Sequence, residues 1–192
     1  AFNETGLTSV TIPASVTTIE GRAFADCTGL VSAYFLGTNP LADEYYEFEP
    51  FQNAALDFKM YYILTFDANG GIGGTSGFIA CGAAISAPAV TKTGYTFNGW
   101  DNDISSTMPQ DKITYTAQWS INSYTVTFDA NGGTGGTSSL MAYGTTLTAP
   151  AVSRAGYILT GWSPAVPATV GAESAAYTAL WMLLGNVNND SV

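Results

Sequence analysis

The stretch YTVTFDANGG at residues 124–133 recurs as YILTFDANGG at residues 62–71. Before the aspartate, apolar and polar residues alternate, which is typical of a strand with one buried face. The Asp-Ala-Asn-Gly-Gly run that follows supplies residues that tolerate the positive φ angles of a tight reversal. Each copy therefore predicts a strand that ends in a turn.

The match extends well beyond this stretch when the chain is laid on itself at a shift of 62 residues. No gap is needed, and the shared segments are GGTS (73 and 135), PAV (88 and 150), GY (94 and 156), GW (99 and 161) and YTA.W (115 and 177). Residues 61–121 and 122–182 are therefore predicted to be two equivalent domains. Because the linker at residues 120–123 is short and polar, we expect residues 122–182 to fold when excised.

Within the second copy, two further strands are predicted, over residues 157–162 and 176–181. Pro150 marks a break between elements. The simplest outcome for each domain is a small, mostly antiparallel sheet.

The shared pattern of the two copies, YTVTFDANGG followed by YG, PAV, GY, GW and YTA.W, resembles the internalin B-repeat, also called the Listeria-Bacteroides repeat. The resemblance covers both copies and implies the β-grasp-like fold of that family. The first copy departs from the pattern at Cys81, where the second copy has the aromatic Tyr143. We expect Cys81 to be a buried thiol rather than a nucleophile, because no activating base is evident.

Residues 1–60 have a different and shorter repeat period. AF and GL at residues 1–7 return at residues 23–30, a period that suits leucine-rich repeats. LTSVTIPASVTTIEGRAFADCTGL, at residues 7–30, resembles the BspA-like leucine-rich repeats of bacterial surface proteins. Since solenoid coils need neighbours to bury both faces, residues 1–60 are expected to be the C-terminal part of a longer array. Cys27 is expected to be a buried thiol inside a turn of this solenoid.

The predicted fold class is thus mainly β. The end of a leucine-rich-repeat solenoid (1–60) is followed by two tandem small β-grasp-like modules (61–121 and 122–182), and residues 183–192 form a linker or the start of another unit.

Composition narrows the function classes. Fifteen acidic residues against five basic ones give a net charge of −10, which repels nucleic acid and anionic lipid. The nearest candidate for a membrane span, residues 179–184, is far shorter than the roughly 18 residues that a span needs. Two cysteines in different segments do not indicate a disulfide framework. We expect an extracellular, secreted or cell-wall-attached protein, with any signal peptide outside residues 1–192.

Catalytic chemistry has little support in the sequence. The chain has no histidine, which removes the commonest general base and the usual zinc ligands. The glycine-rich segment 67–75 lacks the Gly-Lys-Ser/Thr of a phosphate loop, so it is interpreted as a turn. Asp67 and Asp129 are expected to accept amide hydrogens in these turns. The prediction is a protein that is not an enzyme.

The four tryptophans, Trp100, Trp119, Trp162 and Trp181, could form a sugar-stacking platform, since each repeat contributes two. The alternative is that they belong to the core. A small domain needs its largest apolar side chains inside, which favours the core interpretation.

Two segments raise the question of calcium. The acidic run Asp43, Glu44, Glu47 and Glu49 does not have the spacing of an EF-hand loop and is interpreted as a solvated face. The segment GNVNNDSV at 185–192 resembles the opening of the calcium loop of a type I dockerin, with Asn186, Asn188 and Asp190 at the ligand positions. Asn186 and Ser191 depart from the family's Asp and Gly. We expect no cofactor within this chain, and calcium, with cohesin as partner, only in a chain that extends beyond residue 192.

Two functions remain open. The first is adhesion or protein interaction, with the solenoid presenting a binding face to a protein or glycan ligand and the B-repeats acting as spacers or binding modules. The second is a carbohydrate-binding or accessory component of a dockerin-bearing polysaccharide-degrading assembly.

Overall fold

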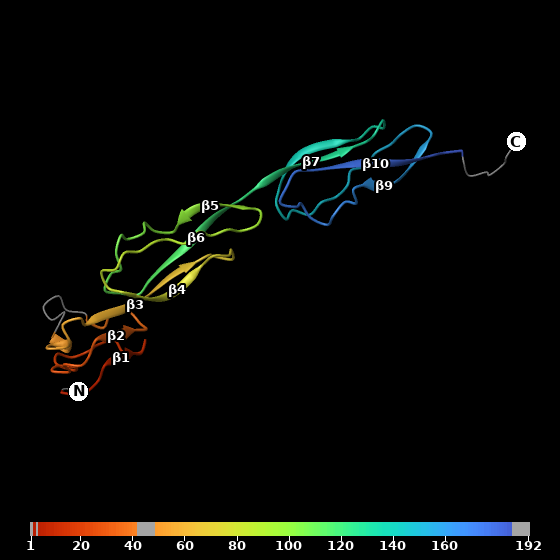
Figure 1. Cartoon of the computed structure of the whole chain (residues 1–192). Coiled ribbons are helices and arrows are strands. Elements are labelled where there is room, and N and C mark those ends of the chain that lie inside the picture. Colours follow the sequence, from red (N-terminus) through yellow and green to blue (C-terminus); the bar gives the residue numbers. More distant parts are fainter. Residues whose placement is uncertain (1, 3, 42–48, 186–192) are drawn as a thin grey trace. The chain divides into compact units, whose positions relative to one another are not determined.

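The computed structural model describes residues 2, 4–41 and 49–185 of the chain (Figure 1). Across these ranges the regular structure is β, apart from the short 3-10 helix η1 (Glu49–Phe51), so the mainly-β prediction is confirmed. Contacts divide the chain into two compact units, one made of residues up to 91 with 98–118, the other of residues 92–97 with those from 119 onward.

The strands follow one another along the chain in the order of their labels in Figure 1. Their bounds are β1 (Ser9–Ile12), β2 (Ser32–Phe35), β3 (Lys59–Asp67), β4 (Thr75–Ala80), β5 (Tyr95–Trp100), β6 (Ile113–Ile121), β7 (Ser123–Asp129), β8 (Thr137–Ala142), β9 (Tyr157–Ser163) and β10 (Ala175–Leu183).

The first unit begins as a stack of parallel coils. Ser9 of β1 pairs with Ser32 of β2, which pairs with Lys59 of β3, so the chain returns to the sheet every 23 to 27 residues. At the opposite side of the coil, the rings of Phe2, Phe24 and Phe51 stack with centroid separations of 5.3 Å at both steps.

Cys27 lies within this stack. Its side chain is fully buried, and its thiol donates a hydrogen bond to the Phe2 carbonyl oxygen at 2.9 Å, with the Thr5 hydroxyl 3.3 Å away. The prediction of a buried thiol at this position is confirmed.

The long strand β3 is shared between the coils and the first repeat. Residues 59–62 pair with β2, residues 64–67 pair in parallel with β6, and the other edge pairs antiparallel with β4. One hydrophobic core follows this strand, from Phe35 of the coils to Tyr115 of the repeat. Residues 60 and 61, where the sequence places a domain boundary, both lie within β3.

The second unit contains a four-stranded sheet in the order β8-β7-β10-β9. The two outer pairs are antiparallel, whereas the central strands β7 and β10 are parallel, with Val126 opposite Ala175. The first repeat arranges β4, β3, β6 and β5 in the same way. A small, mostly antiparallel sheet is thus confirmed, and the predicted strands 124–128, 157–162 and 176–181 correspond to β7, β9 and β10. The β-grasp-like classification stays a prediction.

The turn after the first strand of each repeat has the predicted chemistry. The amide N–H of Asn69 donates to the Asp67 carboxylate, and that of Asn131 donates to Asp129, both at 2.8 Å. The two asparagines have φ angles of 49° and 48°, and the side-chain amide of Asn131 donates to the carbonyl oxygen of Ala179 at 2.9 Å. These segments are turns that lead into strands β4 and β8, as the turn interpretation predicts, and not into the helix that follows a phosphate loop.

Candidate binding surfaces

An aromatic cluster lies on the outer face of the sheet in the first unit. Along β3, Met60, Tyr62, Leu64 and Phe66 are buried, so the alternation of the strand places Tyr61 and Ile63 on the opposite face. Tyr34 of β2 stacks on Tyr61 with 4.8 Å between ring centroids, and Phe78 of β4 meets Tyr34 edge-on at 5.1 Å. We call Tyr34, Tyr61, Ile63 and Phe78 the aromatic face.

Strand register explains why these side chains meet. Tyr34 is the parallel partner of Tyr61, and Phe78 is the antiparallel partner of Ile63. Directly opposed side chains on one face of a sheet lie close enough to touch, and aromatic pairs of this kind contribute roughly 0.2 to 1 kcal/mol each. Phe78 is nevertheless 39% exposed. The cluster therefore offers apolar surface held on a rigid sheet.

The second repeat lacks this surface. At the shift of 62 residues, Tyr61, Ile63 and Phe78 correspond to Ser123, Thr125 and Leu140. The neighbouring hydroxyl pair is the same in both repeats, because Thr65–Ser76 recurs as Thr127–Ser138, both at 2.9 Å. The aromatic side chains are therefore a difference between two repeats that share one backbone arrangement.

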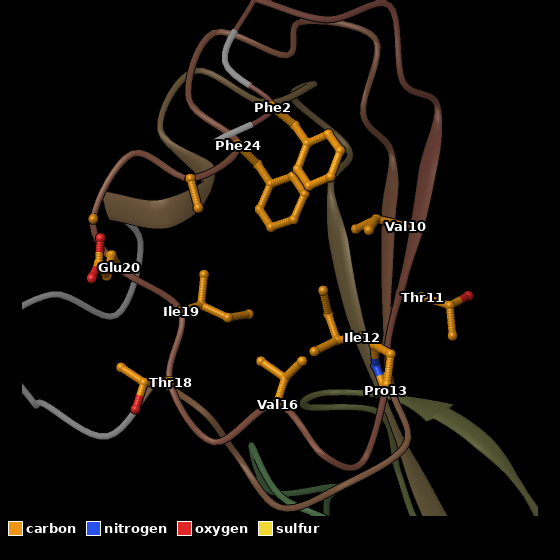
Figure 2. Close-up of a pocket in the computed structure, with 12 residues that line it drawn as sticks. Phe2, Val10, Thr11, Ile12, Pro13, Val16, Thr18, Ile19, Glu20 and Phe24 are labelled. Atoms are coloured by element: carbon orange, nitrogen blue, oxygen red, sulfur yellow. The ribbon is translucent and has the colours of Figure 1, made fainter.

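An apolar cavity of about 440 Å³ lies in the first coil (Figure 2). In Figure 2 the side chains of Ile12, Val16 and Ile19 point into it, beneath the stacked rings of Phe2 and Phe24. Among the described residues that line it, Glu20 is the one that carries a charge, and none is a cysteine or a basic residue. A cavity with this mostly apolar lining suits an apolar group.

Trp100 and Trp162 pack against the cores of their own repeats, but they are only partly buried. Trp100 meets Phe66 at 4.9 Å and Trp162 meets Phe128 at 5.0 Å, both edge-on. The two are therefore equivalent, as predicted, and contact core aromatics. The core interpretation predicts buried side chains, and in this respect it is wrong, because each indole lies at the border of its core and is partly exposed.

This position reduces the expected cost of removing the indole. Fully buried aromatic residues lose about 3 to 5 kcal/mol on truncation to alanine, and partial exposure leaves less area to lose. We expect Trp162→Ala to lower the free energy of unfolding by about 2 to 3 kcal/mol in urea titrations. If the variant kept its stability and lost affinity for sugars on a glycan array, the sugar-platform alternative would replace the core interpretation.

Metal ligands do not gather in the described part of the chain. Within residues 2, 4–41 and 49–185, no group of three or more acidic, cysteine or histidine side chains could hold a metal ion. No disulfide joins the two cysteines, and Cys27 is buried whereas Cys81 is only half-buried. Asp43, Glu44 and Glu47, like Asn186, Asn188 and Asp190, lie outside the described residues, so the calcium hypotheses stay predictions.

In the same described ranges, no helix is long and apolar enough to cross a membrane.

Comparison with known proteins agrees with the two-repeat architecture. The family model of the Listeria-Bacteroides repeat domain matches residues 62–121 and again residues 124–176. Internalin H of Listeria monocytogenes is 39% identical over 53% of this chain, and a protein of Evansella cellulosilytica, provisionally named a membrane protein, is 35% identical over 53%.

The matched part covers only 20% of Internalin H and 17% of the Evansella protein, so the chain spans about a fifth of these relatives. The leucine-rich-repeat and dockerin resemblances concern residues outside the two family matches and stay predictions. Because the family model matches more than half of the residues in two adjacent copies, the chain belongs to the Listeria-Bacteroides repeat domain family.

Proposed function

We propose that this chain is a non-catalytic part of a bacterial surface or secreted protein that binds a protein ligand through the aromatic face, with the two repeats as spacer or binding modules. The observation that carries this proposal is the aromatic face itself. Tyr34, Tyr61 and Phe78 form an apolar cluster on a rigid sheet, and the equivalent surface of the second repeat is mostly polar. Tyrosine and phenylalanine are enriched in protein interfaces relative to other surface.

The segment before the repeats supports the same function. We propose that residues 1–60 are the end of a leucine-rich solenoid, which is supported by the parallel strands β1, β2 and β3 and by the phenylalanine stack. Solenoids form extended binding surfaces from the side chains on their strands, and Tyr34 lies on one of these strands. The absence of histidine supports a role in binding rather than catalysis.

The second candidate function is binding of a neutral glycan. It is favoured by the partly exposed tryptophans and by the hydroxyl pairs Thr65–Ser76 and Thr127–Ser138 on the sheet surface. The stacked geometry of Tyr34 and Tyr61 reduces the ring surface open to a sugar at the aromatic face, because each ring covers one face of the other. A sugar that stacks on an aromatic ring needs such a face free.

The test replaces the aromatic face by the residues that the second repeat carries. The variant Tyr61→Ser, Ile63→Thr, Phe78→Leu keeps a backbone known to accept these residues, so its unfolding midpoint should fall by only a few degrees. We expect binding to an array of bacterial and host surface proteins to fall at least tenfold. The control, Leu140→Ala in the second repeat, removes exposed apolar surface at the position equivalent to Phe78 and should leave binding unchanged.

A glycan array probed with the same variants separates the two functions. Glycan binding that survives the triple variant and is lost in Trp162→Ala would favour the glycan function. Protein binding that is unchanged in the triple variant would contradict the proposed role of the aromatic face.

A further inference from the structure

We propose that the end of the second repeat formed by β9 and β10 is a docking surface for a further folded repeat of this family, which inserts an aromatic side chain beside Gly156. This proposal does not depend on the aromatic face. It follows from a comparison of Gly94 with Gly156, two equivalent positions within the second unit. An aromatic ring packs against the first of them.

The filled position surrounds Gly94. A Cβ atom added to this glycine, whose φ is +78°, would collide with the ring of Tyr143. The same tyrosine meets Tyr95 edge-on with 6.2 Å between centroids. Its amide N–H donates to the Asn122 carbonyl oxygen at 2.9 Å, and the Asn122 N–H donates to the Gly94 carbonyl oxygen at 2.9 Å. Gly94, Tyr95 and Asn122 thus form what we call the ring seat.

The same seat is formed again 62 residues later. Gly156 has a φ of +80°, Tyr157 follows it, and the N–H of Leu184 donates to the Gly156 carbonyl oxygen at 2.7 Å. Gly94 is buried, whereas Gly156 is exposed, and among the described residues nothing lies within 4 Å of a Cβ added to Gly156. The second seat therefore has the geometry of the first without the ring.

The backbone at this end offers a matching acceptor. The Met60 carbonyl oxygen accepts an N–H from Cys81 at 2.8 Å, and the Asn122 carbonyl oxygen accepts one from Tyr143 at 2.9 Å. Leu184 holds the equivalent position, and within residues 2, 4–41 and 49–185 no amide donates to its carbonyl oxygen. A docked repeat would supply this donor together with the ring.

At this end, apolar side chains of the second repeat stand at positions where the first repeat has polar ones. Four outer positions on or just after the last two strands are polar in the first repeat, and in the second repeat the equivalent residues are apolar and 44 to 53% exposed. The replacements are Thr96 by Ile158, Gln118 by Leu180, Ser120 by Met182 and Asn122 by Leu184. A contiguous exposed apolar patch on a chain of net charge −10 is typical of an interaction surface.

The differences between the two ring seats indicate which kind of partner fits at Gly156. A second copy of this chain does not fit, because its Tyr143 already occupies the seat at Gly94 and its first repeat has Cys81 at that position. The side-chain amide of Asn122 donates to the Tyr124 hydroxyl at 3.4 Å, a bond that Leu184 cannot make. The fitting partner is a repeat with an aromatic residue at the Tyr143 position and an apolar residue at the Tyr124 position.

The test uses a chain in which residues 185–192 are replaced by an added copy of residues 123–184. In this added copy the counterpart of Tyr124 is phenylalanine. We expect NMR contacts between the Gly156 α-protons and the ring of the added counterpart of Tyr143. Replacing that added tyrosine with alanine should lower the urea midpoint of the second repeat about as much as Tyr143→Ala lowers that of the first.

Gly156→Ala supplies the matched control, measured in both the original and the extended chain. Alanine is strained at this φ in either chain, so only an additional loss of midpoint in the extended chain reports the seated ring. An equal loss in both chains, together with no ring contact to Gly156, would overturn the proposal. Sedimentation showing that the original chain dimerises, and that Gly156→Ala abolishes the dimer, would overturn the assigned partner in favour of a second copy.

Discussion

Tyr62→Ala is expected to lower the free energy of unfolding of the first unit by about 4 kcal/mol, a large share of the stability of a domain of this size. Tyr62 is completely buried and stacks on Phe35 with 4.6 Å between centroids and 12° between planes. It lies on β3 where the coils and the first repeat share one core, so the resulting cavity touches both. We expect urea titrations to show one transition for both parts, at a lower midpoint.

The hydroxyl group contributes less than the ring. Burial raises the pKa of Tyr62 well above the ordinary tyrosine value, with smaller effects of the same sign from Cys81 and Asp111. The hydroxyl donates to Asn39 over a long 3.4 Å. Tyr62→Phe should therefore cost about 1 kcal/mol. The control is Tyr124→Ala, the half-buried equivalent in the second repeat. A loss in Tyr62→Ala no larger than in this control would contradict a core shared across β3.

Gly73→Ala and Gly135→Ala are expected to destabilise their repeats by about 3 kcal/mol or more, because two costs combine. Their φ angles of +95° and +92° are unfavourable for any residue with a Cβ atom. The added Cβ would also overlap a backbone oxygen, that of Ala89 in the first repeat and that of Ala151, 2.5 Å away, in the second.

The backbone segment opposite Gly73 cannot easily move away from an added Cβ atom. Ile72 and Thr91 exchange two backbone hydrogen bonds, at 2.8 and 3.1 Å, which fix the opposing segment. The matched controls are Gly82→Ala and Gly144→Ala, at φ +79° and +74°, with nothing within 4 Å of an added Cβ. They should cost only the conformational term of about 1 to 2 kcal/mol. Thermal unfolding that shifts equally in all four variants would show that the close approach has no effect.

Local chemistry explains what the sequence could predict. The alternation before Asp129 and the turn after it depend on neighbouring residues, so strand β7 and the Asp129–Asn131 bond could be predicted without tertiary information. Strands β4 and β8 were not predicted, because they are edge strands with mostly exposed residues and show no apolar alternation. Edge strands have one hydrogen-bonded neighbour and little burial to leave a pattern.

The candidate sites depended on pairing over long distances in the sequence. Tyr34 and Tyr61 are brought together by the register of β2 with β3, which no local pattern specifies. The gapless alignment of the repeats does contain a signal, since Tyr61 and Phe78 stand where the second copy has Ser123 and Leu140. That difference between copies could have identified the aromatic face, but it could not show that Tyr34 joins it. Composition could not show that the side chain of Trp100 is only half-buried.

The parallel pairing of β7 with β10 has a consequence for a chain under tension. These are the first and last strands of the second repeat, and they are hydrogen-bonded side by side from Val126–Ala175 to Asp129–Thr178. Because they run in the same direction, a force that pulls the two ends of the repeat apart acts along the strands in opposite senses. The load is shared by all hydrogen bonds of the pair at once, so they must shear together rather than open one after another. Since forced unfolding is governed by the unfolding rate, each repeat should hold its length under a pull that would unzip an antiparallel hairpin.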